Sequence, residues 1–308
     1  MGFTARKVMD ASYEYPARMS TTSARTGILA VLGAALCFGT TGTTQQLGVP
    51  DISPLSVASA RLLIGSIFLF IFANLQRSTR GDVRMPTRDL LICGTGIGAY
   101  QLTFFSAVHS TGIAIATVTA LGVAPTLSAV IAYFLLGEKP RRNWYLGTAI
   151  SITGIVLVAT AGGVEGFNPK GVSLAVLAGA GFAIFNVLCR RALARGAQDI
   201  WLTATTFGVA ALVTFPFLFA QNPQWILTSK GFASVMWLGF ITTSIGYLLF
   251  MYGLKRIEST VAATVVLAEP ATATILAAFV IGENLVMQSY LGIATVAIGI
   301  LYLARAGR

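Results

Sequence analysis

Charged residues are scarce in this sequence. Only 10% of its 308 residues are Asp, Glu, Lys or Arg, whereas a soluble globular domain carries about 25%. Hydrophobic residues make up 55% of the chain, and the mean hydropathy is +0.77. This composition excludes an ordinary soluble domain and predicts a chain that lies mostly within a membrane.

Long polar stretches are also missing. Apolar segments of about 20 residues follow one another along the whole chain, and this is the length with which a helix crosses a bilayer core of about 30 Å. We expect ten such segments, at 26–47, 54–74, 90–109, 112–136, 144–162, 171–192, 200–220, 231–253, 260–281 and 288–304. The sequence therefore predicts an all-α integral membrane protein with ten transmembrane helices and no room for a soluble catalytic domain.

Residues that commonly carry catalysis or bind metals are few. The chain has one histidine and three cysteines, at Cys37, Cys93 and Cys189, without the spacing of metal ligands. No aspartate lies in an apolar segment, and there is no Gly-x-x-x-x-Gly-Lys-Ser/Thr motif for ATP. We therefore expect no catalytic residues, no metal site, no cofactor and no enzymatic activity, and a gradient as the energy source for any transport.

The net charge of +10 is distributed unevenly. If the amino terminus is cytoplasmic, the inner loops and tails hold eighteen of the 21 basic residues, and the outer loops hold only Lys170 and Lys230. This positive-inside pattern predicts a multi-pass protein of the cell membrane with both termini in the cytoplasm. Residues 1–25 lack the apolar core of a signal peptide and are predicted to be a cytoplasmic tail. The basic charge is expected to face lipid, not nucleic acid.

The chain contains an internal repeat. A shift of 145 positions places Pro125 on Pro270 and Gly137-Glu138 on Gly282-Glu283, and twelve of 35 positions are identical between Pro125–Ala159 and Pro270–Ala304. The sequence thus predicts two five-helix repeats, 26–160 and 171–305, joined by a linker at 161–170. Because five is odd, the second repeat must cross the membrane in the opposite sense, an architecture typical of transporters with a substrate site near the midplane.

Two runs carry a family resemblance. They are "YLLFMYGLKRIESTVAATVVLAEPATATILAAFVIGE" (Tyr247–Glu283) and its counterpart "AVHSTGIAIATVTALGVAPTLSAVIAYFLLGE" (Ala107–Glu138). Both resemble the EamA-type branch of the drug/metabolite transporter superfamily, and the resemblance extends over about 26–304. It implies ten helices, cytoplasmic termini and export of amino acids or other small metabolites from a central cavity. The chain departs from the family at Phe38-Gly39, where a tryptophan often precedes the glycine.

Glu269 is the most informative polar residue. It lies about nine residues into the ninth segment, which is roughly 14 Å along a helix and close to the midplane. A carboxylate there must hold a proton, pair with a cation or face water. We interpret it as a substrate-binding and proton-coupling residue, with a structural hydrogen bond as the alternative. The neighbouring Pro270 and its counterpart Pro125 are predicted kink points for gating, although a static bend would also explain them.

Other polar and aromatic residues are candidates for lining the substrate cavity. The predicted substrate-binding residues besides Glu269 are Asn186, Tyr247, Gln101, Tyr100, Thr41, Thr40 and Phe104. Thr41 and Asn186 occupy equivalent positions in the two repeats. Threonine can instead bond to its own helix, and aromatic residues in membrane helices often serve packing alone.

Three further charged residues receive structural interpretations. Arg61 could bind a substrate carboxylate, but its position toward the outer end of the second segment favours snorkelling to the surface or pairing with Asp51. Glu138 and Glu283 lie at helix ends beside glycine, where they are expected to anchor turns or pair with loop arginines.

These observations predict a secondary transporter that exports a small metabolite, an amino acid or a related compound, by alternating access, with proton antiport at Glu269 as the motivated mechanism. The alternatives are efflux of lipophilic cations and, from another class, a membrane assembly factor that transports nothing. The expected partners are a small-molecule substrate, the lipid bilayer and protons, with the chain as a monomer or homodimer.

Overall fold

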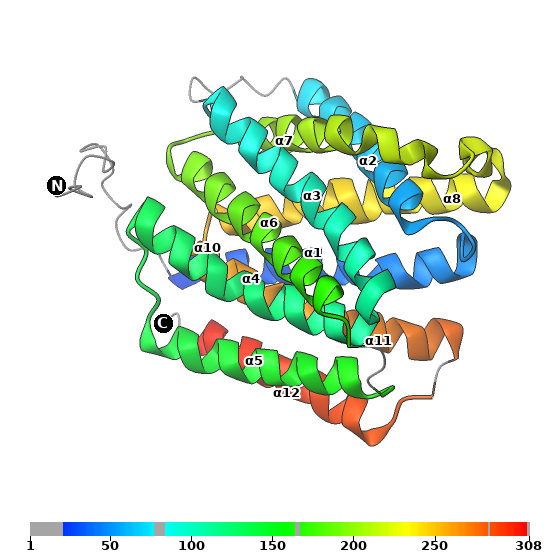
Figure 1. Cartoon of the computed structure of the whole chain (residues 1–308). Coiled ribbons are helices and arrows are strands. Elements are labelled where there is room, and N and C mark those ends of the chain that lie inside the picture. The colour runs from blue at the N-terminus through cyan, green and yellow to red at the C-terminus, as the bar shows by residue number, and fades with distance from the viewer. Residues whose placement is uncertain (1–20, 77–83, 164–166, 283, 307–308) are drawn as a thin grey trace, which may run out of the picture.

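The computed structural model describes residues 21–76, 84–163, 167–282 and 284–306 (Figure 1). Within these ranges the chain is helical and contains no strand. Ten stretches are long and apolar enough to cross a membrane, from Thr22–Gly48 to Met287–Arg305. The predicted fold, ten helices in two inverted repeats, is confirmed. The tail up to residue 20, part of the linker (164–166) and Glu283 lie outside the described residues.

Each half contributes five spans. The first half contains α1 (Thr21–Gly48), α2 (Pro54–Leu75), α3 (Thr87–Thr111), α4 (Ile113–Leu136) and α5 (Arg142–Thr160). The second contains α6 (Pro169–Ala194), α7 (Asp199–Thr214) with η2 (Phe215–Ala220), η3 (Pro223–Leu227) in a loop, α8 (Ser229–Trp237) with η4 (Leu238–Ile245) and α9 (Gly246–Leu254), then α10 (Ser259–Val265), α11 (Ala268–Leu276) and η5 (Ala277–Ile281), and α12 (Met287–Ala306). Helix α1 begins five residues earlier than residue 26, since polar residues at a helix end extend it without changing the apolar span.

The halves meet around a pseudo-twofold axis between α5 and α12. A Cβ atom built on Gly154 would lie 2.9 Å from the carbonyl oxygen of Gly292, and one built on Gly292 would lie 2.9 Å from that of Gly154. Gly147 and Gly299 form the corresponding pair. The repeat shift of 145 converts each pair into the other. Glycine at these four positions therefore lets the two helices touch backbone to backbone, as small residues do in membrane helix pairs.

A second pair of equivalent crossings joins α3 to α7 and α2 to η4. Gly94 on α3 lies against Val209 on α7, and its counterpart Gly239 in η4 lies against Ile64 on α2, the counterpart of Val209. Both contacts are too close for a methyl group. In each half, a glycine of the third span therefore packs against a β-branched residue in the second span of the other half.

The second half departs from the first in the continuity of its helices. The span that contains Pro125 is uninterrupted, whereas the span that contains Pro270 breaks at Val266 and Leu267 between α10 and α11. Proline cannot donate to the carbonyl of Val266, and the amide of Glu269 donates to that oxygen instead, at 2.8 Å. Residues Leu238–Ile245 and Ala277–Ile281 form π-helical turns, which often occur at functional sites. Of the two predicted kink points, Pro270 follows a break in its helix, whereas Pro125 lies within a continuous helix.

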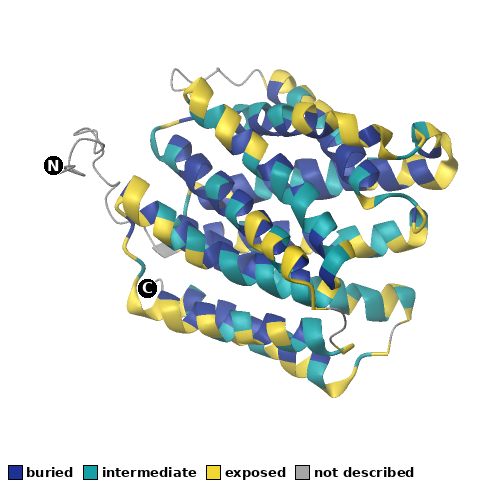
Figure 2. Cartoon of the chain, viewed as in Figure 1, coloured by how far each residue is buried: buried dark blue, intermediate teal, exposed yellow. Residues whose placement is uncertain are grey.

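Side chains sort by their surroundings as expected for a membrane protein. Buried residues follow the inward faces of the helices and exposed ones follow the outer faces (Figure 2). The exposed outer surface carries large apolar side chains, among them Phe279, Leu212 and Phe134. Together with the ten apolar spans, this surface defines a multi-pass membrane protein.

One end of the bundle collects most of the positive charge, and we call it the basic end. Here α4 and α6 finish, α10 begins, and the described chain also starts and finishes (Figure 1). Its described basic residues are Arg25, Arg84, Arg88, Lys139, Arg141, Arg142, Arg190, Arg191, Arg195, Lys255, Arg256 and Arg305. This distribution agrees with the loop charges on which the predicted orientation rests.

Candidate functional site

Four polar side chains from four helices form a group inside the bundle. They are Arg61 on α2, Tyr100 on α3, Tyr247 on α9 and Glu269 on α11. The charges of Arg61 and Glu269 act on each other and on both tyrosine hydroxyls. We call these residues the central polar group. Each half of the protein supplies two of them, so the group lies where the halves meet.

Glu269 lies directly after the break between α10 and α11. It occupies the first turn of α11, where the helix dipole favours a negative charge. Its side chain is partly accessible and forms no hydrogen bond or ion pair with the described residues. The alternative of a structural hydrogen bond to a neighbouring helix is therefore not observed. A carboxylate left open at this depth is available to a proton or to a substrate cation.

Neither of the two contacts expected for Arg61 is observed. The side chain is buried, with 6% of its surface exposed, so it does not snorkel to the surface. It forms no ion pair with Asp51, which is exposed, or with any other described carboxylate. Its buried Nε atom has no hydrogen-bond acceptor. Its position toward one end of α2 suggested an exposed side chain, and the sequence alone could not show that α2 turns this face inward.

Aromatic rings enclose the tyrosines of the central polar group. The Tyr247 ring lies 4.3 Å from that of Phe207 and 4.7 Å from that of Phe38, between ring centroids. The Tyr100 ring is stacked on Phe104 at 6.0 Å. The predicted candidates Tyr247, Tyr100 and Phe104 thus belong to a wall of rings, which can hold an apolar substrate portion while the hydroxyls offer hydrogen bonds.

The remaining candidates of the first half lie on α1 and α3. Gln101 follows Tyr100 and is buried, and its Nε2 atom has no acceptor. Thr40 donates to the carbonyl of Cys37 and accepts a bond from the indole of Trp237, at 3.1 Å. Its hydroxyl is therefore already engaged. Thr41 is partly accessible and forms no hydrogen bond with described residues, so Gln101 and Thr41 are the two with free polar groups.

Asn186 belongs to a different cluster, nearer the basic end. Its Nδ2 donates to the Ser128 hydroxyl at 3.2 Å and to the Ser259 carbonyl at 2.8 Å. The Ser259 hydroxyl in turn donates to Glu138 at 2.7 Å, and Arg190 approaches the same carboxylate at 3.6 Å. We call these five residues the Glu138 network. It joins α4 of the first half to α6 and α10 of the second.

Glu138 and Arg190 are both almost inaccessible, with 1% and 2% of their side chains exposed. Burial raises the pKa of the Glu138 carboxyl, while the Ser259 hydroxyl and the Arg190 charge oppose that rise. The cost of removing this carboxylate from water thus exceeds its attraction to Arg190. Glu138 pairs with an arginine as expected, but the partner lies within α6 and not in a loop.

Replacing Asn186 by alanine tests whether it is part of the helix contact. We expect the free energy of unfolding to fall by about 1–2 kcal/mol, because two interhelical hydrogen bonds are lost. Thr41→Ala, the equivalent change in the other repeat, should leave stability nearly unchanged. Denaturant titration in mixed micelles would measure both. Equal stabilities of the two variants would contradict a structural role for Asn186 and leave it as a cavity residue.

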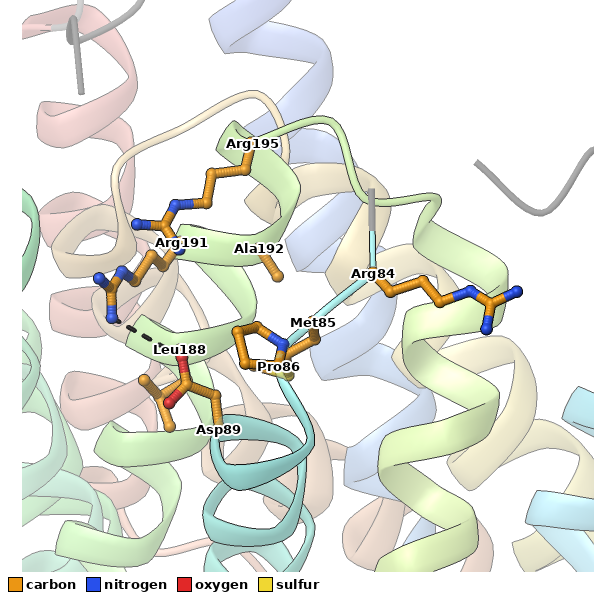
Figure 3. A pocket seen from close by; sticks show the side chains of 8 residues that line it. All are labelled: Arg84, Met85, Pro86, Asp89, Leu188, Arg191, Ala192 and Arg195. Atoms are coloured by element: carbon orange, nitrogen blue, oxygen red, sulfur yellow. Dashed lines mark ion pairs between the residues drawn. The ribbon is translucent and has the colours of Figure 1, made fainter. Parts of the chain in front are cut away.

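Two hollows in the molecule are unsuited to a polar substrate. One lies at the basic end between the start of α3 and the end of α6, where Arg191 pairs with Asp89 at 3.7 Å and Arg84 points away (Figure 3). Its volume of about 10 Å³ holds roughly one water molecule. The other, of about 450 Å³, lies between α2, α3 and α7 and is lined mainly by apolar side chains. The central polar group remains the best candidate site.

A ten-helix bundle of inverted repeats, with two charged residues inside the bundle that form no ion pair, has the architecture of a secondary transporter. The EamA-like transporter family matches residues 25–160 and 169–305. The chain belongs to this family, and hence to the drug/metabolite transporter superfamily, as the resemblance predicted.

Related proteins agree with this assignment. An uncharacterized transporter of Bacillus subtilis, YwfM, is 34% identical over 91% of this chain and 94% of its own length. An uncharacterized transporter of Archaeoglobus fulgidus is 27% identical over 90% of this chain and 96% of its own. A crystal structure described only as that of a protein has a TM-score of 0.77 at 22% identity, over 91% of this chain and 98% of that one. This last similarity supports the fold alone.

Proposed function

We propose that this transporter exports a small amphipathic metabolite, an amino acid or a close relative, from the cytoplasm by alternating access. The basic end faces the cytoplasm in this proposal, because loops rich in Lys and Arg remain on the inner side of the cell membrane. Protons that enter the cell bind Glu269 in exchange for the substrate. The single observation that carries the proposal is the unpaired Glu269 carboxylate at the break between α10 and α11, in the middle of the ninth span.

The surroundings of Glu269 support an amphipathic substrate with an amino group. A free carboxylate can bind either an ammonium group or a proton, and this competition is what antiport requires. The rings around Tyr247 offer an apolar wall for the rest of the molecule. Efflux of lipophilic cations would use the same wall, but the positive charge of Arg61 beside Glu269 disfavours a substrate that carries only positive charge.

The Glu138 network supports alternating access. It joins the two halves at the basic end through buried polar contacts, and in this proposal these contacts close the substrate site on the cytoplasmic side. An inward-open state must separate α4 from α6 and α10 and expose Glu138 and Arg190 to water. Hydration of the two charges then compensates for the lost ion pair, which makes the contact reversible. A static assembly factor would have no need for a reversible contact of this kind.

Glu269→Gln tests the proposal. Proteoliposomes that contain the protein and an equimolar mixture of the twenty L-amino acids are diluted into acidic buffer, and released compounds are measured by mass spectrometry. The natural sequence should release at least one amino acid faster when protons can run inward. Glu269→Gln cannot exchange a proton, so its release should not respond to the pH gradient.

The matched control is Asp51→Asn, which removes an exposed carboxylate outside the helices. It should respond to the gradient like the natural sequence. If the pH gradient still accelerates amino acid release in Glu269→Gln, this result would contradict proton antiport through Glu269. Failure of the natural sequence to release any of the twenty compounds would remove amino acids as substrates.

A further inference from the structure

We propose that Arg61 binds the carboxylate of the substrate, and that this residue makes the transporter selective for compounds that carry one. This inference rests on the proposed function and assigns a second charged contact to the same site. It is carried by a buried guanidinium that forms no ion pair with the described residues, on a helix face that packs against the eighth span.

The burial of Arg61 is unusual for an unpaired charge. A guanidinium does not lose its proton in a protein, so the positive charge persists at 6% exposure. Its buried Nε has no acceptor, and no described carboxylate lies within ion-pair distance. An isolated charge inside a membrane protein is costly. An anionic group bound to Arg61 would offset this cost, and a carboxylate can accept two parallel hydrogen bonds from a guanidinium.

The packing of α2 fixes the direction of Arg61. Gly65 lies one helical turn further along the same face and contacts the Thr243 side chain of η4. The Ser244 hydroxyl donates to the Gly65 carbonyl at 3.0 Å, so the contact between α2 and η4 is also tied by a hydrogen bond. This face of α2 therefore lies against the eighth span. Tyr247 lies about one helical turn after Thr243 in that span. The contact therefore fixes the face of α2 that carries Arg61 against the span that carries Tyr247 of the central polar group.

The charges around Arg61 define the class of ligand. Glu269 is the one carboxylate whose charge interacts with the central tyrosines, and it forms no ion pair with Arg61. Gln101, next to Tyr100 on α3, has a buried amide nitrogen without an acceptor. A positive group and a negative group whose charges interact without forming an ion pair match a zwitterion, whose carboxylate binds Arg61 and whose ammonium group binds Glu269. An amine without a carboxylate would leave Arg61 buried and unsatisfied.

Equilibrium binding to the full chain in lipid nanodiscs tests this assignment. The probes are the twenty L-amino acids and their carboxamides, which keep the size and the amine but lose the negative charge. Binding is measured by isothermal titration calorimetry on the natural sequence, Arg61→Gln and Arg61→Lys. We expect at least one amino acid to bind about tenfold or more tightly than its carboxamide. Arg61→Gln should abolish this preference, and Arg61→Lys should retain part of it.

A purely structural role for Arg61 would change the result in a recognisable way. Arg61→Gln would then weaken amino acid and carboxamide equally and keep their ratio, and this outcome would overturn the proposal, as would equal affinities in the natural sequence. Binding of the carboxamides alone would be consistent with a transporter that exports amines, and it would contradict only the proposed role of Arg61. Binding of neither series would remove the proposed function together with this inference.

Discussion

Replacing Glu138 by alanine should lower the free energy of unfolding by about 3–5 kcal/mol, because removal of one member of a buried ion pair leaves the other charge unpaired. Among the described residues, Arg190 would then keep a long contact of 3.5 Å to the Lys255 carbonyl. The Ser259 amide and hydroxyl would also lose their acceptor. Denaturant titration in mixed micelles, followed by circular dichroism, would measure the loss.

A double variant separates the ion pair from the rest of the contact. Burial raises the pKa of Glu138 despite the nearby Arg190, so the pair does not fully recover the cost of leaving water. Glu138→Leu combined with Arg190→Met removes both charges together and fills similar volume. We expect it to unfold within about 1 kcal/mol of the natural sequence, far from the loss in Glu138→Ala.

The control for this series is Asp51→Ala, which removes an exposed carboxylate and should change stability by less than about 0.5 kcal/mol. A Glu138→Ala variant that is as stable as this control would show that the carboxylate is not buried against Arg190. A double variant as unstable as Glu138→Ala would show that the hydrogen bonds of Ser259, and not the charges, hold the three helices together.

The fold could be predicted from the sequence because its causes are local and repeated. Length and apolarity define each span, and the shift of 145 residues, visible in pairs such as Gly147 and Gly292, implies inversion once five spans are counted. The break in the helix at Val266 was harder to predict from the sequence. Pro125 and Pro270 are equivalent in sequence, yet only the second interrupts its helix, since the outcome depends on how neighbouring helices pack and on the carbonyl that Glu269 satisfies.

The candidate site could be predicted only in part. The depth of Glu269, Tyr100 and Tyr247 in their spans can be estimated from their residue numbers, and the structure brings all three into the central polar group. Rotation of a helix about its axis does not follow in the same way, since polar residues here are too few to mark a face. Arg61 was therefore interpreted as a surface residue. Asn186 donates hydrogen bonds to Ser128 and Ser259 and belongs to the Glu138 network.

The second large effect on stability is expected where α5 and α12 cross. Gly154→Leu should lower the free energy of unfolding by about 3 kcal/mol, because its Cβ would lie 2.6 Å from the amide nitrogen of Val296. Backbone atoms cannot move aside like the end of a flexible side chain, so the helices must separate. Gly299→Leu, the same change at the counterpart of Gly154 in the second repeat, meets the equivalent amide, that of Ser151, at 2.9 Å. The two variants should therefore lose the same amount.

Gly42 is the matched control, since a Cβ on this helical glycine meets nothing within 4 Å. Gly42→Leu should stabilise the protein by up to about 1 kcal/mol, because leucine favours a helix more than glycine does. Denaturant titration of the three variants would thus give two equal losses and one gain. Small losses for both crossing variants would contradict the close contact of α5 and α12. Unequal losses would contradict the twofold relation, whereas equal ones would show that the inverted repeat extends to the energies of individual contacts.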